Sequence, residues 1–345
     1  MSDLDHTLTN LDALVAYGLM DEASAEACGS VADTYAVAVT AEMAEVIKGG
    51  SPGVAAQFLP TANELQAHPA ELSDPIGDEA HSPVAGIVHR HRDRVLFKIV
   101  GACPVYCRFC FRREMVGPGL GKTLTAPEID AALDYIAAHT EVREVIFTGG
   151  DPLVLSARRI REIGTKVGAV PHIDVLRWHS RVPVVDPTRI TDDLVEALVV
   201  AGKATFIAIH ANHPDEFTPA ARSACRRLIA NGITLLSQSV LLHGVNDASV
   251  VLERLMRTFV GLGINPYYLH HGDLAPGTAH FRVPIARGLH LVGELRRRVS
   301  GLCQPVYVLD LPGGFAKVPL TDHAVREIGA GQYEIDDGCG QTHIY

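Results

Sequence analysis

Residues 94–113 read RVLFKIVGACPVYCRFCFRR, and they join a short apolar run to a loop that carries three cysteines. The VLFKIV run is rich in β-branched and aromatic residues, which is typical of a buried strand. Cys103, Cys107 and Cys110 follow it with the spacing C-x3-C-x2-C. The chain has an odd number of cysteines, seven, and is a poor disulfide framework. The stretch therefore predicts a strand that ends in a loop built for chemistry.

The strand-like pattern recurs along the chain, and helical patterns separate its copies. Stretches such as ITDDLVEALVVAG (190–202) and DASVVLERLMRTF (247–259) have the apolar spacing of helices. We count about six strand–helix units and a last strand, and this alternation predicts parallel strands with right-handed crossovers. The predicted fold class is α/β, a partial (β/α)6-type barrel. The later strand-like runs are VREVIFTGG (142–150), HIDVLRWHS (172–180), ATFIAIHA (204–211), TLLSQSVLL (234–242), INPYYLHH (264–271) and PVYVLDLPGG (305–314).

The flanks of this barrel pattern differ from it. Residues from about 7 to 48 show helical periodicity, and residues 51–82 are richer in Pro, Gly and acids. Within the barrel pattern, Thr125 and Glu128 are spaced as a capping box at the start of a helix. We therefore expect an N-terminal helical region with a linker (1–85), a barrel core (86–320) and a C-terminal tail (321–345).

Composition excludes several functional classes. The 345 residues are 47% hydrophobic, which is ample for a large core, and the formal charge of 30 − 40 = −10 disfavours a phosphate-binding surface. The start, MSDLDHTLTN, is unlike a secretory leader, and no apolar run approaches the ~20 residues of a membrane helix. The run Arg296-Arg297-Arg298 fits the end of a helix. We expect a cytoplasmic protein that binds neither nucleic acid nor membranes.

Unusual polar residues collect where the predicted strands end. Active sites of barrels lie at the C-terminal ends of their strands, so these residues predict one catalytic mouth. The alternative for any single residue is that it caps a helix or satisfies a loop. The residues are the three cysteines, the GGDP run of 149–152, His210, Gln238, Asp273 and Asp310.

The three cysteines have two chemical interpretations. Thiolates ligate iron–sulfur clusters, and a cubane with three protein thiolates leaves one iron open to another ligand. A structural zinc site usually takes four protein ligands and would need one from elsewhere in the chain. Spacing alone therefore favours the cluster and leaves zinc as the alternative.

With Phe109 directly before the last cysteine, the motif resembles the signature of the radical S-adenosylmethionine superfamily. The resemblance implies a 4Fe–4S cluster whose open iron holds S-adenosylmethionine, the source of a 5′-deoxyadenosyl radical. The TGGDP run resembles the superfamily's glycine-rich segment for the cofactor's amino group, which implicates Gly149, Gly150 and Asp151. Taken alone, GGDP is equally an ordinary turn between a strand and a helix.

A narrower resemblance, to lysine 2,3-aminomutases, covers about residues 74–320. It implies a second cofactor, pyridoxal phosphate, bound as an imine to Lys317 in DLPGGFAKVP. Without the resemblance, Lys317 would be read as a surface lysine. The segments that carry it are DPIGDEAHSPVAGIVHRHRDRVLF (74–97), HSRVPVVDP (179–187), HANHPDEFT (210–218), SQSVLLHGVND (237–247), PYYLHHGDLAPGTAHFR (266–282) and LDLPGGFAKVP (309–319).

Further roles follow from the same resemblance. Arg112 matches the arginine that binds the substrate carboxylate, a role suited to a planar fork of donors. Asp273 and Asp310 match the acid pair that receives the lysine side-chain ammonium. Two neighbouring carboxylates repel each other unless a cation lies between them, so the pair favours a cationic substrate.

The remaining cofactor contacts are also implied by resemblance. His210 and Gln238 match positions that contact S-adenosylmethionine. Arg90 and Arg94 match positions that hold pyridoxal phosphate, although His91 stands where a tyrosine is common.

The expected activity is migration of the amino group of L-lysine from C2 to C3, giving β-lysine. The short chain resembles bacterial members that supply β-lysine for modification of elongation factor P. Three alternatives stay open: a glutamate 2,3-aminomutase, a related radical enzyme acting on another amine, and a non-catalytic iron–sulfur protein.

Partners and other metal sites complete the expectations. The expected partners are an amino-acid substrate and a reductant protein such as flavodoxin or ferredoxin, and a homo-oligomer is left open. Cys339 stands alone near the end of the chain, so we expect no C-terminal zinc site. The other histidines lack the spacing of metal ligands; they include His89, His213, His270, His271 and His280.

Overall fold

The computed structural model describes residues 4, 6–117, 119, 121–321, 325–329, 332–336 and 341–344. Its centre is a nine-stranded sheet in which the order of the strands in space is their order in the chain. β2 to β8 are parallel, and the edge strands β1 and β9 are antiparallel to their neighbours. The strands are β1 (Ile87–His91), β2 (Arg94–Val100), β3 (Glu144–Gly149), β4 (Val175–Ser180), β5 (Ala204–His210), β6 (Thr234–Val240), β7 (Asn265–His270), β8 (Val306–Asp310) and β9 (Lys317–Pro319).

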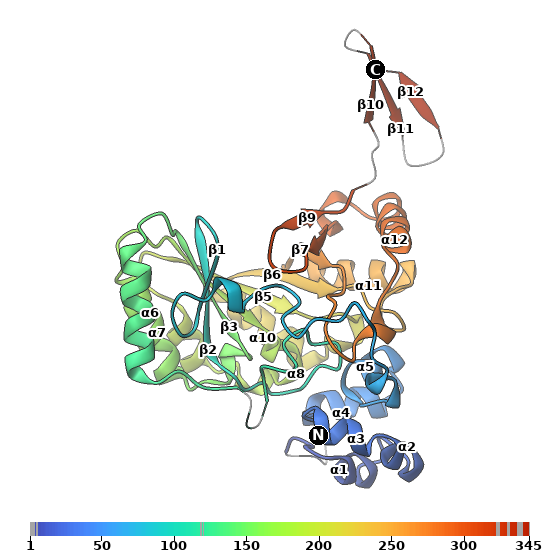
Figure 1. The fold of residues 1–345 in the computed structure, drawn as a ribbon, viewed down its shortest axis with the longest axis horizontal. Coiled ribbons are helices and arrows are strands. Elements are labelled where there is room, and N and C mark those ends of the chain that lie inside the picture. Colours follow the sequence, from blue (N-terminus) through green and yellow to red (C-terminus); the bar gives the residue numbers. More distant parts are fainter. Residues whose placement is uncertain are drawn as a thin grey trace.

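Helices connect the parallel strands and lie on the outside of the curled sheet (Figure 1). Each turns an apolar stripe inward; α7, for example, buries Ile160, Ile163 and Val167. The capping box of Thr125 and Glu128 is present at the start of α6. The prediction of a partial barrel with six strand–helix units and a last strand is confirmed. The helices are α6 (Ala126–Ala138), α7 (Ala157–Gly168), α8 (Val182–Val185), α9 (Asp192–Leu198), α10 (Pro219–Ala230), α11 (Ser249–Gly261) and α12 (Ile285–Arg298).

Five short helices precede the barrel and lie beside its lower part in Figure 1. Four of them fall within residues 7–48, where the periodicity predicts helices, and the fifth, α5, falls in the segment expected to be a linker. Their apolar side chains, including Leu14, Met43 and Phe58, belong to the same hydrophobic cluster as the barrel core. They are α1 (Leu11–Ala16), α2 (Glu22–Ala27), α3 (Gly29–Thr34), α4 (Ala41–Lys48) and α5 (Pro52–Phe58). Short 3₁₀ turns are η1 (Ala62–Leu65), η2 (Glu79–His81), η3 (Pro152–Val154), η4 (Pro187–Arg189), η5 (Pro214–Glu216), η6 (Ala279–Phe281) and η7 (Gly301–Cys303).

Several strands were not predicted from the sequence. β1 and β9 are short edge strands whose polar residues hide the alternation of a half-buried strand. A separate antiparallel sheet of β10 (Val325–Gly329), β11 (Gln332–Asp336) and β12 (Thr342–Ile344) occupies the segment expected to be only a tail, and it stands apart from the barrel in Figure 1. Cys339 lies outside the described residues.

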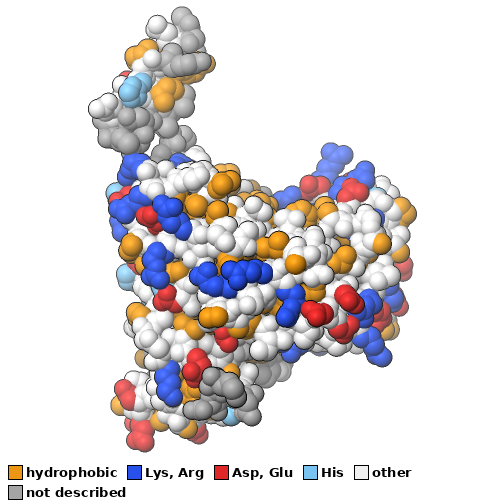
Figure 2. Space-filling view, turned by 180° about the vertical axis from the view of Figure 1, so that it is seen from behind, with side chains coloured by type: hydrophobic (Ala, Val, Ile, Leu, Met, Phe, Trp, Pro, Cys, Tyr) orange, Lys and Arg blue, Asp and Glu red, His pale blue; other side chains and the backbone are white. Residues whose placement is uncertain are grey.

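The outer surface carries both signs of charge. On the face in Figure 2, basic and acidic side chains are interspersed over the helices. Among the residues described, no helix has the length and apolar character needed to cross a membrane.

Candidate active site

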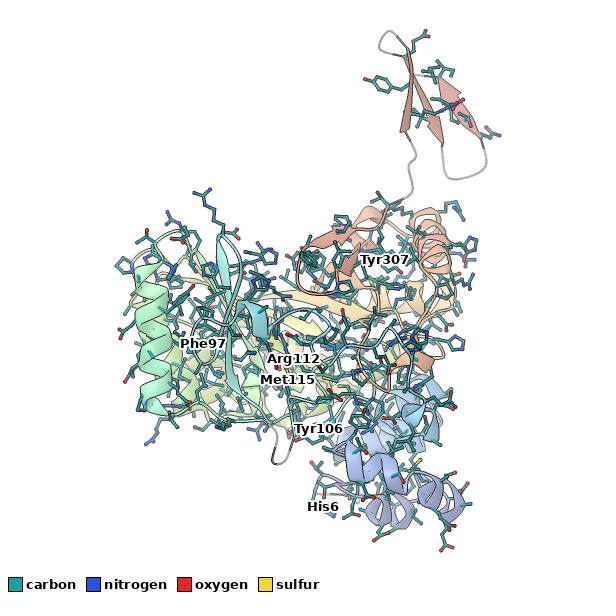
Figure 3. All side chains as sticks on the ribbon, viewed as in Figure 1. His6, Phe97, Tyr106, Arg112, Met115 and Tyr307 are labelled. Atoms are coloured by element: carbon teal, nitrogen blue, oxygen red, sulfur yellow. The ribbon has the colours of Figure 1, made fainter. Side chains whose placement is uncertain are left out.

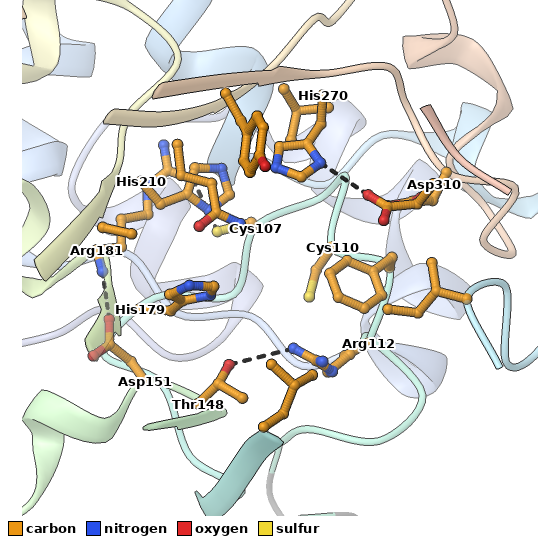
Figure 4. A pocket seen from close by; sticks show the side chains of 18 of the residues that line it. Cys107, Cys110, Arg112, Thr148, Asp151, His179, Arg181, His210, His270 and Asp310 are labelled. Carbon is orange, nitrogen blue, oxygen red and sulfur yellow. Dashed lines mark hydrogen bonds and ion pairs between the residues drawn. The ribbon is translucent and has the colours of Figure 1, made fainter. Parts of the chain in front are cut away.

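One cavity at the C-terminal ends of the barrel strands collects every site residue that the sequence analysis named. It is lined by residues from β1 to β9 and from the loops that follow them, and Figure 4 shows part of its wall. Figure 3 places Arg112 near the centre of the molecule, between Phe97 on β2 and Tyr307 on β8. The predicted residues that line it are Arg90, Arg94, Cys103, Cys107, Cys110, Arg112, Gly149, Gly150, Asp151, His210, Gln238, Asp273, Asp310 and Lys317.

The cysteine loop, residues 101–117, follows β2 and brings its three thiols to the cavity wall. Burial raises the pKa of Cys103 well above the ordinary value for a thiol, and the charges of Asp151 and the other cysteines raise it further. Burial likewise raises the pKa of Cys110 to about 11. Binding of a positively charged metal centre would convert such thiols to thiolates with release of protons. Within the described part of the chain, no three His, Cys, Asp or Glu side chains are gathered closely enough to hold a single metal ion.

A buried ionic cluster supports the cysteine loop from below. Glu64, on η1, accepts hydrogen bonds from the guanidinium groups of Arg108 and Arg113, which flank the last cysteine of the motif. The Arg108 Nη2 to Glu64 Oε2 distance is 2.6 Å, and both side chains are almost fully buried. Burial alone would raise the pKa of Glu64, but the two arginines outweigh it and hold that pKa below its ordinary value. The sequence analysis missed Glu64 because its partners lie 44 and 49 residues away.

Arg181 is a second residue that sequence reasoning missed. It follows β4 in the HSRVPVVDP segment, which was quoted without a role for this arginine. Its Nη1 lies 2.9 Å from Cys107 Sγ, and its Nη2 lies 2.7 Å from Glu216 Oε2 and 2.5 Å from Gln57 Oε1. An arginine thus donates a hydrogen bond to one of the three sulfurs and is fixed by two buried acceptors.

The GGD segment packs against the cysteine loop. A Cβ at Gly149, whose φ is +114°, would collide with the carbonyl oxygen of Val100, and a Cβ at Gly150 would collide with that of Ala102. The glycines therefore allow β3 to end against the backbone of the loop, whereas the sequence analysis linked them only to the cofactor's amino group.

Asp151 has its carboxylate occupied. It accepts hydrogen bonds from Ser180 Oγ (2.8 Å) and from the backbone N–H groups of Arg181 (2.6 Å), Leu153 (3.0 Å) and Val182 (3.2 Å). Burial raises its pKa in spite of these donors. Its side chain fixes the end of β4 beside the cysteine loop.

Arg112 is oriented by a buried carboxylate that the sequence analysis did not single out. Asp78 accepts from Arg112 Nε at 3.0 Å, and Arg112 Nη1 lies 3.4 Å from Thr148 Oγ1. Asp78 also lies 3.7 Å from Arg90 Nη2 and 3.8 Å from Lys98 Nζ. Burial would raise the pKa of Asp78, but Arg112, Lys98 and Arg90 hold it below its ordinary value.

The two arginines predicted to hold pyridoxal phosphate differ in environment. Arg90 Nη1 donates to the carbonyl oxygen of Ile76 at 2.5 Å, whereas Arg94 pairs with the exposed Asp93 at 2.8 Å. Both line the cavity at its β1–β2 side, with His91 between them in sequence. Burial, followed by the charges of Arg94 and Arg90, lowers the pKa of His91.

On the far strands of the sheet, three side chains form what we call the lysine group: His270, Asp310 and Lys317. Lys317 Nζ lies 2.5 Å from Asp310 Oδ2, and His270 Nδ1 lies 3.0 Å from the same oxygen. Lys317 Nζ is 3.4 Å from His270 Nδ1. Burial would raise the pKa of Asp310, but His270 and Lys317 hold it well below its ordinary value.

The acid pair is therefore asymmetric. Asp310 already has two partners, whereas burial and the charge of Asp310 raise the pKa of Asp273 to about 7. The sequence analysis set His270 aside with the remaining histidines, although its place at the end of a strand was the signal that identified the other site residues.

His210 and Gln238 are neighbours in the register of β5 and β6. Burial and then Arg181 lower the pKa of His210 well below its ordinary value, so this imidazole is neutral. His179, which the sequence analysis did not name, is the next-to-last residue of β4 and lies in the cavity wall of Figure 4. Its pKa is also lowered well below the ordinary value, by burial and then by the cations Arg177 and Arg112.

A partial barrel with three cysteines on the loop after its first parallel strand is the architecture of a radical S-adenosylmethionine protein, and the Radical SAM superfamily model matches residues 97–254. The chain belongs to the L-lysine 2,3-aminomutase family.

Three relatives document that membership. L-lysine 2,3-aminomutase of Clostridium subterminale is 39% identical over 291 residues, which is 84% of this chain and 70% of the relative. That of Fusobacterium nucleatum is 36% identical over 320 residues, 92% of this chain and 75% of the relative. That of Escherichia coli is 36% identical over 288 residues, 83% of each chain. A radical SAM methyltransferase structure from Sphaerobacter thermophilus has a TM-score of 0.45, 19% identity, and coverage of 65% of this chain and 68% of that chain.

Proposed function

We propose that this protein is a cytoplasmic lysine 2,3-aminomutase, an isomerase that moves the α-amino group of L-lysine to C3 and so produces β-lysine. The family membership supports the reaction class. The observation that carries the proposal is the convergence of all fourteen predicted site residues, from eight of the nine strands and the loops that follow them, on one cavity. A non-catalytic iron–sulfur scaffold would have no use for an arginine, two acids and a lysine in the same cavity.

The cavity suits the cofactors of this chemistry. Cys103, Cys107 and Cys110 would hold the 4Fe–4S cluster; their buried sulfurs line the wall, and one already accepts a hydrogen bond from Arg181. His210, Gln238 and the GGD segment, which line the same cavity on strands that follow β2 in the sheet order, would contact S-adenosylmethionine. When bound, the cluster and S-adenosylmethionine supply a carbon radical, and pyridoxal phosphate supplies a carbonyl that carries the migrating nitrogen.

Lys317 would bind pyridoxal phosphate covalently, and Arg90 and Arg94 would hold its anionic end. The positions of these residues support this division. Lys317 lies on β9 at one edge of the sheet, and the two arginines lie at the other edge, on β1 and β2. Both edges face the same cavity, so one elongated ligand can reach both.

The substrate assignment rests on charge. Arg112, held by Asp78, would bind the substrate carboxylate, and Asp273 with Asp310 would bind the terminal ammonium. L-glutamate would instead bring its side-chain carboxylate to two acids, which is unfavourable for like charges in a buried site. We therefore favour lysine over glutamate. A flavodoxin or ferredoxin would supply the electron, and elongation factor P modification is one destination for the product.

The test is anaerobic reconstitution of the full chain with iron and sulfide, followed by incubation with S-adenosylmethionine, pyridoxal phosphate, a reductant and L-lysine. We expect β-lysine by chromatography and mass spectrometry, and no β-glutamate from L-glutamate in a parallel reaction. A preference for glutamate over lysine, or cleavage of S-adenosylmethionine without rearrangement of lysine, would contradict the proposal. Borohydride reduction followed by peptide mapping should locate the pyridoxyl group on Lys317 and on none of Lys98, Lys122 or Lys203.

A further inference from the structure

We propose that His270 is a catalytic acid–base residue that removes a proton from Lys317 and then donates it to the oxygen that departs as water, so that the Lys317 amine can form its bond to an aldehyde cofactor. This inference rests on the proposed function, in which Lys317 carries pyridoxal phosphate. It assigns a role to a histidine that the reaction described above does not otherwise use.

Strand pairing places the three members of the lysine group together. Asp310 and Lys317 are direct partners across the antiparallel strands β8 and β9, and His270 ends the neighbouring strand β7, where it pairs with Val308. The ring of His270 is fixed on both sides, because Nδ1 faces Asp310 and Lys317 while Tyr268 packs edge-on with a centroid distance of 5.6 Å. The geometry is therefore a property of the sheet and does not depend on a loop conformation.

The resting arrangement creates a need for a base. An ammonium that lies 2.5 Å from a carboxylate is stabilised in its protonated form, and a protonated amine has no lone pair with which to attack a carbonyl carbon. Asp310 is a poor acceptor for that proton because its own pKa is held well below the ordinary value. His270 offers a second basic atom beside the Lys317 amine, because its Nδ1 lies 3.4 Å from Lys317 Nζ.

His270 is suited to the task. Burial lowers the pKa of His270 although its contact with Asp310 raises it, and the charge of Lys317 lowers it further, which favours a neutral imidazole that can accept a proton. In the tautomer that carries its hydrogen on Nε2, Nδ1 is an acceptor, as Asp310 Oδ2 is, and the Lys317 ammonium lies within reach of both atoms, at 3.4 Å and 2.5 Å, so that it can donate to each. After the transfer, the new Nδ1–H lies 3.0 Å from Asp310 and donates to it, which stabilises the imidazolium.

The step balances without an added oxidant or reductant. One proton moves from Nζ to His270 Nδ1, the nitrogen lone pair bonds to the aldehyde carbon, and the carbonyl electron pair moves to its oxygen. That oxygen takes a second proton from the nitrogen and then the first one from His270, and it departs as water. The nitrogen keeps one proton and a double bond to carbon, and His270 is neutral again.

Other titratable groups face the ring less closely. Asp310 and Lys317 contact it from β8 and β9, and Asp273 follows it on the loop after β7. The electrostatic effects of His179 on β4 and His210 on β5 also reach it, but both have strongly lowered pKa values and are neutral. The pH dependence of Lys317 chemistry should therefore be controlled by His270 and should appear on the acid side of an ordinary histidine pKa.

The experiment uses the reconstituted full-length protein stripped of pyridoxal phosphate. Addition of pyridoxal phosphate in a stopped-flow instrument gives the rate of imine formation from absorbance, as a function of pH. His270→Asn keeps an amide N–H for Asp310 but cannot accept a proton. We expect it to slow imine formation by on the order of a hundredfold and to lose the acid limb, since general acid–base catalysis is worth about that much or more. His271→Asn is the matched control, because His271 pairs with Tyr307 Oη outside the cavity wall; its rate should equal that of the wild type.

His270→Ala supplies a second, independent test. Added imidazole should restore the rate in proportion to the concentration of its neutral form, while the final extent of imine and the cluster absorbance match those of the wild type. A His270→Asn protein that is as fast as the wild type, or a His270→Ala protein that imidazole does not rescue, would overturn the inference even if the trapped adduct lies on Lys317. An adduct on another lysine in the wild type would overturn the Lys317 assignment and this inference together.

Discussion

The cysteine loop and the lysine group lie in the same cavity but are built in opposite ways. The cysteine loop is held by backbone packing against Gly149 and Gly150 and by the buried Glu64 cluster, and its sulfurs line the cavity, where Arg181 donates a hydrogen bond to Cys107. The lysine group, in contrast, is held by its own reactive side chains, since Lys317 and His270 both bond to Asp310.

The two groups therefore differ in how accessible their cofactor-binding atoms are before a cofactor binds. The cysteine loop separates support from chemistry, so its ligands are available without breaking a contact. In the lysine group the same side chains provide both support and chemistry, so the hydrogen bond between Lys317 and Asp310 must be broken before Lys317 can react. Substitutions in the cysteine loop should abolish activity or leave it unchanged. Substitutions in the lysine group should lower activity by degrees and in a pH-dependent way.

The largest effect is expected at the cysteines. Cys107→Ala should abolish turnover and lower the iron retained after anaerobic reconstitution, because a cubane held by two thiolates lacks a protein ligand. Iron analysis and product assay measure both. Cys303→Ala, at a buried position on η7 away from the cavity, is the control and should behave as the wild type. Wild-type activity in the Cys107→Ala protein would contradict a radical mechanism that depends on the cluster.

The support beneath the loop should be tested by stability. Glu64→Gln leaves Arg108 and Arg113 buried without a counter-charge, which should cost about 3–5 kcal/mol of unfolding free energy in urea titration. The matched change Glu162→Gln removes one partner of the partly exposed Arg159 pair on α7 and should cost about 1 kcal/mol or less. Equal losses in the two variants would mean that the buried cluster does not support the loop.

On the substrate side, Asp273→Asn is a cleaner probe than Asp310→Asn, because Asp310 also holds Lys317 and His270. Loss of an ion contact in a buried site costs roughly 3–5 kcal/mol, so kcat/KM for lysine should fall by on the order of a hundred- to a few-thousand-fold. Asp130→Asn, on the outer face of α6, serves as the control. A loss of only a few-fold at Asp273 would contradict the substrate assignment.

The same residue predicts a pH effect. Burial and the charge of Asp310 raise the pKa of Asp273 to about 7, and a bound ammonium would favour the ionised form. Lysine should therefore bind more tightly above pH 7 and more weakly below it, by up to tenfold per pH unit for a single group. KM measured from pH 6 to 9 tests this, and the dependence should vanish in the Asp273→Asn protein. A pH-independent KM in the wild type would show that Asp273 is ionised before substrate arrives.

The smallest effect is expected at Arg181. Its N–H group bonds to Cys107 Sγ, and such bonds favour the reduced, more negative state of a cluster. Arg181→Lys keeps a cation for Glu216 but loses the fork, so the midpoint potential should fall by on the order of 60 mV, which corresponds to about 1.4 kcal/mol for one electron. Spectroelectrochemical titration measures it, with Arg222→Lys on α10 as the control. An unchanged potential would remove Arg181 from the tuning of the cluster.

The same contrast explains what could be predicted from sequence. The cysteine motif is local, because three ligands fall within eight residues, and the strand–helix alternation is read from short-range periodicity. The role of Lys317 could be predicted only from the resemblance to a known family. Contacts such as Arg181 to Cys107, 74 residues apart, and Glu64 to Arg108, 44 apart, depend on which strands become neighbours. No local pattern encodes such contacts, and the same holds for His270.

Five short strands were not predicted from the sequence for a different reason. β1, β9 and the three strands of the C-terminal sheet are each five residues or fewer. Strands this short contain too few alternations to be distinguished from loops, and a strand at an edge has one neighbour to bury its residues. Lys317 lies on such a strand, which is why its own neighbourhood was the hardest part of the site to foresee.

The strand order of the sheet has a consequence for how the enzyme is made. Since each strand lies beside the one synthesised just before it, a chain emerging from the ribosome can extend its sheet one strand at a time. The cysteine loop is translated before half of the barrel exists, and Lys317 arrives with β9, the last strand of the nine-stranded sheet. A nascent chain arrested just short of residue 317 would hold its iron–sulfur ligands and both substrate acids, but not the amine that makes pyridoxal phosphate useful. Assembly thus proceeds from the radical source toward the carbonyl carrier, and the nine-stranded sheet and the set of catalytic residues are completed by the same strand.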